Sequence, residues 1–219
     1  LSSKMDIKAL IFDMDGLLFD SERIVQRSWE MAGDELGIPH MGDVIYHTLG
    51  MNRTGRNEYF RKYIREDFPF EEFGRLTRDN FWKIVDKEGL PLKKGVKELL
   101  AYGKAQGYKM AVATSSSREY AMGNLIRAGI DPYFDSVICG DMVKKAKPDP
   151  EIYQKASESL GIPPEYCMAF EDAPGGILSA HQAGMKVIMV PDLVQPTEEI
   201  RELTYRVCDS LADVIGILN

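Results

Sequence analysis

The sequence is poor in the residues that most often bind transition metals or form disulfides. It has three cysteines and three histidines in 219 residues. Cys139, Cys167 and Cys208 lie far apart and lack the close pairing of a zinc site, so we expect reduced, buried thiols in a cytoplasmic protein. The histidines are His40, His47 and His181. They are not spaced as metal ligands either; we expect His181 on a helix face and the other two on the surface of the helical insert.

The sequence also lacks long hydrophobic runs and an excess of positive charge. No apolar run approaches the roughly 18 residues that a membrane-spanning helix needs, and no basic segment precedes an apolar one as in a secretory signal. The net charge of −7 and the pI near 5.1 exclude a general attraction for nucleic acid or anionic membranes. Apolar residues make up 44%, so the chain can bury one large core or two small ones.

The second half of the chain alternates short apolar runs with helical patterns. Together with a run near the N-terminus, the predicted strands are 7–12, 108–114, 136–139, 166–171 and 186–190. The predicted helices are 96–106, 118–128, 150–160, 174–183, 197–202 and 209–218. Such alternation is typical of right-handed crossovers and a parallel sheet covered on both faces.

The segment between the first strand and this alternating half is predicted to be mostly helix, with no convincing strand. Helical spacing of apolar residues predicts helices at 20–36, 43–49, 54–66 and 71–87. The predicted fold is therefore α/β: a Rossmann-like, doubly wound parallel sheet core with an inserted all-helical cap domain. The core would comprise residues 1–19 and 89–219, and the cap residues 20–88.

Polar side chains follow several predicted strands at the point where each strand ends. They are Asp13 and Asp15, Thr114 and Ser115, Lys147 in the segment KKAKPDP, and Glu171 and Asp172. Each alone also fits a helix cap, a turn or an exposed charge. Open α/β sheets bind ligands at the carboxyl edge, so the coincidence of position predicts one site.

The chemistry that suits this set is phosphoryl transfer. Clustered carboxylates tolerate one another when a cation lies between them, and oxygen ligands favour Mg²⁺. Asp13 and Asp172, with a backbone carbonyl near Asp15, could hold this ion, and Glu171 would orient the ligands or add an oxygen. The Thr114 hydroxyl and the N–H groups that follow it, from Ser115 onward, suit phosphate oxygens.

The same set offers a nucleophile and a proton carrier. A carboxylate can attack phosphorus and form an acyl phosphate that water then hydrolyses. Asp15 could protonate the leaving oxygen and later deprotonate the water. Lys147 would balance the charge of the phosphate and of the nucleophile.

Four motifs give the chain a resemblance to the haloacid dehalogenase superfamily, in the branch with a helical cap after the first strand. They are DMDGLLFDSE (13–22), VATSS (112–116), KPDP (147–150) and EDAPGGILSAHQAGM (171–185). The resemblance implies Asp13 as nucleophile and Asp15 as acid/base. It implies that Thr114 and Lys147 bind phosphate, and that Mg²⁺ contacts Asp13, the Asp15 carbonyl, Glu171 and Asp172. The dehalogenases themselves lack a carboxylate at the position of Asp15, so the resemblance implies a phosphatase or a phosphomutase.

Within this branch the sequence favours a phosphatase acting on a sugar phosphate or a similar small metabolite. A β-phosphoglucomutase-type activity is the main alternative, because Arg53 matches that enzyme's phosphate-binding arginine. Leu49 and Val25, however, replace a lysine and a histidine of the mutase. A catalytically inert module of the same fold is less favoured, because no expected catalytic residue is missing. A response-regulator receiver would have no helical insert, and a dinucleotide-binding domain would need Gly-x-Gly-x-x-Gly after its first strand.

Overall fold

The computed structural model describes residues 5–48, 51 and 53–219, which divide into two compact units. The first unit contains residues up to Asp20 and from Pro91 to Asn219, and the second spans Ser21–Leu90. No helix in the described part of the chain combines the length and the apolar character that a membrane crossing requires. Leu49, in the segment compared with the mutase, lies outside the described residues.

The first unit is built on a six-stranded sheet with the order β3-β2-β1-β4-β5-β6, in which every neighbouring pair is parallel. The strands are β1 (Ala9–Phe12), β2 (Lys109–Ala113), β3 (Ser136–Ile138), β4 (Cys167–Glu171), β5 (Lys186–Met189) and β6 (Arg206–Val207). The central strand β1 has the sequence ALIF and is fully buried. Because both faces of the sheet are covered, the inner strands consist mainly of consecutive buried apolar residues, as expected.

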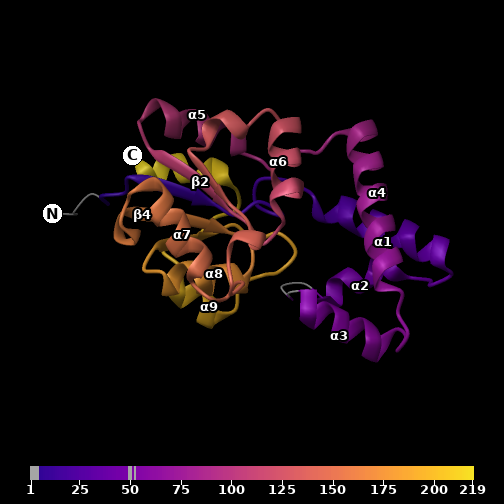
Figure 1. Ribbon diagram of the computed structural model, residues 1–219. Coiled ribbons are helices and arrows are strands. Elements are labelled where there is room, and N and C mark those ends of the chain that lie inside the picture. The colour runs from indigo at the N-terminus through magenta and orange to yellow at the C-terminus, as the bar shows by residue number, and fades with distance from the viewer. Residues whose placement is uncertain (1–4, 49–50, 52) are drawn as a thin grey trace. The chain divides into compact units, whose positions relative to one another are not determined.

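Helices cover both faces of this sheet (Figure 1). They are α5 (Val96–Ala105), α6 (Arg118–Arg127), α7 (Glu151–Leu160), α8 (Pro174–Gln182), α9 (Glu198–Leu203) and α10 (Val214–Leu218). Helices α7 and α8 pack with Ala9 and Ile11 in one core cluster. On the other face, Gly103 of α5 lies against Leu10 and Met110. The doubly wound α/β fold is confirmed.

The end of the chain differs in detail from the prediction. A helix was expected over 209–218, but the structure has a 3₁₀ turn at Leu211–Asp213 followed by the short α10. Ser210 is extended, with φ −155°, and its hydroxyl accepts from the N–H of Ala212, which delays the start of the helix. The two-residue strand β6 was not predicted.

The second unit consists of α1 (Glu22–Leu36), α2 (Met41–Thr48), α3 (Arg53–Tyr63) and α4 (Phe70–Glu88). Its core is aromatic: Trp29, Phe60 and Phe73 pack edge to face with ring centroids 5.6–5.7 Å apart. Gly37 ends α1 in the left-handed conformation, with φ 72°, as its position after the apolar pattern predicts.

The two segments that link the units are paired with each other inside the first unit. Phe19 and Leu92 form an antiparallel bridge. The N–H of Asp20 donates to the carbonyl of Pro91 at 2.9 Å, and the N–H of Lys93 donates to that of Leu18 at 2.9 Å. The chain therefore leaves and re-enters the first unit at one place.

Candidate active site

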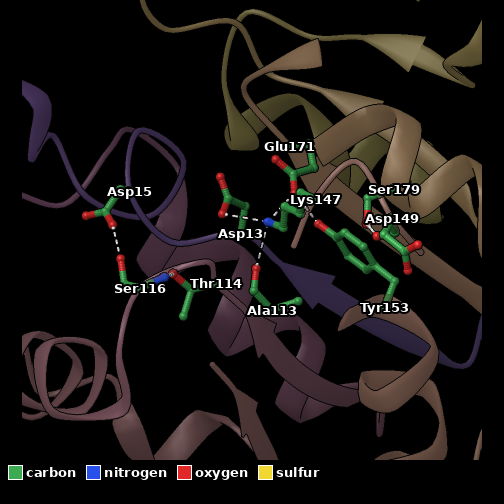
Figure 2. Close-up of polar contacts among 10 residues, drawn as sticks. All are labelled: Asp13, Asp15, Ala113, Thr114, Ser116, Lys147, Asp149, Tyr153, Glu171 and Ser179. Carbon is green, nitrogen blue, oxygen red and sulfur yellow. Dashed lines mark hydrogen bonds and ion pairs between the residues drawn. The ribbon is translucent and has the colours of Figure 1, made fainter. Parts of the chain in front are cut away.

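Three neighbouring strands bring the predicted residues to one edge of the sheet. Strand β1 pairs with β2 on one side and β4 on the other, with Phe12 opposite Val112 and Phe170. Asp13, Thr114 and the pair Glu171 and Asp172 therefore stand side by side at the carboxyl ends of these strands. Figure 2 shows the first two together with Glu171.

The ammonium group of Lys147 lies at the centre of this cluster. Its Nζ donates to Asp13 Oδ1 at 3.1 Å, to Glu171 Oε1 at 2.7 Å and to the Ala113 carbonyl at 3.0 Å (Figure 2). The Lys147 and Asp13 side chains are only 10% and 13% exposed. All three donor positions of the ammonium thus have acceptors, which fixes the group beside Asp13.

The pKa values of both Lys147 and Glu171 are raised in this cluster, for different reasons. Burial alone would lower the pKa of Lys147, but the charges of Asp13 and Glu171 outweigh it and hold that pKa above its ordinary value. Burial raises the pKa of Glu171, and the charge of Asp13 raises it further against Lys147, to about 8. The cluster therefore carries more negative charge than one ammonium balances.

The donor set fits a hard divalent cation. Asp13, Glu171 and Asp172 each offer an oxygen, and these three oxygens lie within 4.8 Å of one another. Carboxylate oxygens alone, without sulfur or imidazole, suit Mg²⁺. A cation among them would also offset the charge of Asp13, which adds to burial in raising the pKa of Glu171.

Two glycines leave room for these carboxylates. A Cβ on Gly176, in the first turn of α8, would lie 2.1 Å from the Glu171 carboxylate. A Cβ on Gly16, where φ is +79°, would lie 2.2 Å from Asp172 Oδ2 and 3.2 Å from Asp192 Oδ2. Larger side chains at either position would displace the acidic oxygens.

Asp15 has a different set of partners. Its Oδ2 accepts from the Ser116 hydroxyl at 3.0 Å and its Oδ1 from the Tyr120 hydroxyl at 2.9 Å. Both donors are uncharged, and both follow strand β2.

The predicted phosphate ligands differ in their exposure. Thr114 is buried, and its hydroxyl oxygen accepts from the N–H of Ser116 at 3.1 Å, so its own hydrogen can still be donated. Ser115 is exposed, and its carbonyl lies so close to Gly140 that a Cβ there would be 2.1 Å away. Arg53, the predicted substrate contact, is exposed at the first residue of α3 in the second unit.

Two tyrosine hydroxyl donors of the site and one nearby acidic residue were not predicted from the sequence. The hydroxyl of Tyr153 in α7 donates to Glu171 Oε1 (Figure 2), Tyr120 donates to Asp15, and Asp192 accepts from Lys93 at 2.8 Å. Because Tyr153 follows Ile152 in a predicted helix, its sequence context predicts a core residue. Only its position six residues after Lys147 could have linked it to the site.

Comparisons with known proteins agree on one family. The sequence model described as haloacid dehalogenase-like hydrolase matches residues 10–190. YhcW of Bacillus subtilis is 34% identical over 212 residues, which are 95% of this chain and 94% of YhcW. A phosphorylated carbohydrates phosphatase of Thermotoga maritima is 32% identical over 182 residues, 83% of this chain and 84% of that protein.

A solved structure supports the same grouping. CbbY from Rhodobacter sphaeroides, crystallised in complex with phosphate, superposes with a TM-score of 0.83 at 27% identity. The match covers 97% of this chain and 99% of that one. The similarity therefore extends over both units.

Proposed function

Since this chain belongs to the haloacid dehalogenase-like hydrolase family, we propose that it is a Mg²⁺-dependent phosphatase that hydrolyses small phosphate monoesters through a phosphorylated aspartate. The observation that carries the proposal is the position of Asp13. This residue directly follows the central strand β1, and its carboxylate lies 3.1 Å from the Lys147 ammonium and belongs to the oxygen triad with Glu171 and Asp172.

The first step transfers the phosphoryl group to the protein. An Asp13 oxygen forms a bond to phosphorus while the bond from phosphorus to the ester oxygen breaks. Asp15 gives its proton to that departing oxygen, which leaves as an alcohol. Thr114 and Lys147 bind the phosphate oxygens, on which negative charge is spread during the transfer.

The second step releases the phosphate. Asp15, now a carboxylate, takes a proton from a water molecule that attacks phosphorus, and the bond to Asp13 breaks. Inorganic phosphate leaves, and both aspartates return to their initial state. Mg²⁺, held by Asp13, Glu171, Asp172 and the Asp15 carbonyl, would supply positive charge against the phosphate and the nucleophile.

We assign the choice of ester to the second unit, in which Arg53 is the candidate contact for a polar group of the substrate. The partner we propose is a small phosphorylated metabolite rather than nucleic acid, because the net charge is −7. The thiols of Cys139, Cys167 and Cys208 are free and buried. This supports a reducing compartment, for which we propose the cytoplasm.

A phosphate-release assay with Asp13→Asn tests the proposal. The wild type should release phosphate from sugar phosphates only when Mg²⁺ is supplied, and Asp13→Asn should lose this activity because an amide nitrogen cannot attack phosphorus. Asp209→Asn, an exposed aspartate of the same unit, is the matched control. Normal turnover by Asp13→Asn would refute the covalent route. Isomerisation of a hexose phosphate that depends on an added bisphosphate would favour the mutase instead.

A further inference from the structure

Two hydroxyl groups hold the carboxylate of Asp15 from two different positions in the chain. Ser116 lies in the loop after β2 and donates to Oδ2, and Tyr120 lies in the first turn of α6 and donates to Oδ1. All three residues are partly buried. Each carboxylate oxygen therefore has its own donor, and the pair together restrict both side-chain torsions of Asp15.

The backbone around these donors is itself fixed. The N–H of Gly140 donates to the Ser116 carbonyl at 2.8 Å, which attaches the loop to the segment after β3. The Ser117 hydroxyl caps α6 by accepting from the N–H of Tyr120 at 3.3 Å. The N–H of Arg118 adds a bond to Asp141 Oδ2 at 3.2 Å. Ser116 and Tyr120 thus stand on a loop and a helix start whose backbone is held by hydrogen bonds.

Proton transfer to a departing oxygen is sensitive to such positioning. A general acid must lie within hydrogen-bond reach of the oxygen that it protonates, and small displacements of a catalytic group cost large factors in rate. A carboxylate with one fixed oxygen can still rotate, whereas one with two cannot do so without breaking a bond.

We propose that Tyr120 is a positioning residue for the acid/base Asp15 and that it shares this role with Ser116. The inference rests on the proposed function, and it assigns part of the protonation step to a tyrosine on α6. Tyr120 then acts on the departing oxygen only through Asp15.

The test varies the leaving group. The three probes differ in how strongly their departing oxygen needs a proton. p-Nitrophenyl phosphate releases a phenolate that leaves without a proton, ribose 5-phosphate releases an alcohol that needs one, and phenyl phosphate lies between them. The measured quantity is kcat/KM, which reports the steps up to the transfer to Asp13. Tyr120→Phe should lower kcat/KM about tenfold for ribose 5-phosphate, the worth of a hydrogen bond to a charged group, and less than about twofold for p-nitrophenyl phosphate. Ser116→Ala should give the same pattern.

A double-mutant cycle separates positioning from a structural role. In an Asp15→Ala background, Tyr120→Phe should change kcat/KM for phenyl phosphate by less than about twofold, because the residue through which it acts is gone. Tyr102→Phe is the matched control, since it also removes a tyrosine hydroxyl that donates to a side-chain oxygen, here Asn219 Oδ1 at 2.6 Å. It should leave all three substrates unaffected.

Three results would overturn the inference. The first is an equal loss on all three substrates, and the second is an undiminished loss in the Asp15→Ala background. The third is normal kcat/KM of Tyr120→Phe when the wild type is active and the loss in Asp15→Ala depends on the leaving group; the proposed function would then stand. A wild type that hydrolyses none of the esters would instead overturn the proposed function and the inference with it.

Discussion

Asp13 and Asp15 are two residues apart in the chain, yet the side chains that donate hydrogen bonds to their carboxylates differ in chemistry. The region around Asp13 is charged: an ammonium and two further carboxylates face it. The region around Asp15 offers two neutral hydroxyls, from Ser116 and Tyr120. The backbone turns at Gly16, where φ is +79°, directly after these two aspartates.

The difference corresponds to the two roles that we propose. A nucleophile must stay ionised, and a neighbouring cation favours the ionised form. An acid/base must gain and lose a proton within one turnover. A hydroxyl can donate to a carboxylate and can also accept from a carboxylic acid, so contacts with Ser116 and Tyr120 can persist in both states.

Removing the cation from the charged region should have the largest effect. Lys147→Met leaves Asp13 and Glu171 without their partner and the phosphate without a positive side chain. We expect kcat/KM to fall on the order of 10⁴-fold and the free energy of unfolding, measured by urea denaturation without Mg²⁺, to fall by about 3–5 kcal/mol. The control is Lys104→Met, because the ammonium of Lys104 lies over the Tyr133 ring and away from the carboxylate cluster. Equal stability of both variants would show that the charged region is not a buried ion-pair network.

Changing the acid/base should reduce activity with little effect on stability. Asp15→Asn keeps a carbonyl oxygen as acceptor for one hydroxyl but cannot carry the proton, so kcat/KM for an alkyl phosphate should fall about 10³-fold. The unfolding midpoint should stay close to that of the wild type. A large loss of stability here, comparable to that of Lys147→Met, would remove the contrast between the two regions.

A smaller effect is expected from a methyl group beside the charged region. Gly176→Ala would place a Cβ against the Glu171 carboxylate, whereas Gly175→Ala, one residue earlier in α8, meets nothing within 4 Å. The Mg²⁺ concentration for half-maximal activity should rise about tenfold in Gly176→Ala only, as for other changes that misorient metal ligands. An equal response of the two variants would mean that the position of Glu171 is not critical.

The charged region could be predicted from the sequence and the neutral one only in part. The apolar runs of strands β1, β2 and β4 are unambiguous, and parallel strands align their carboxyl ends. The residues at or directly after these ends are Asp13, Thr114, Glu171 and Asp172. Lys147 was found because its motif lies between two such strands. These positions follow from topology alone.

Helix-borne partners do not follow from topology. Tyr120 and Tyr153 reach the site through side-chain directions that depend on how α6 and α7 pack on the sheet. In the sequence both look like ordinary helix residues. Strand β6 escaped prediction for a related reason: Arg206 and Val207 are held by backbone pairing to β5, and two residues show no pattern.

The bridge between Phe19 and Leu92 has a practical consequence for engineering. Since the outgoing and returning segments are hydrogen-bonded neighbours, the 70 residues of Ser21–Leu90 occupy the place of a hairpin loop in the first unit. A foreign helical module whose ends are about 5 Å apart, the spacing of paired strands, could be spliced in at these two positions. If the second unit selects the ester, as we propose, chimeras between relatives would exchange that preference and leave the sheet edge untouched.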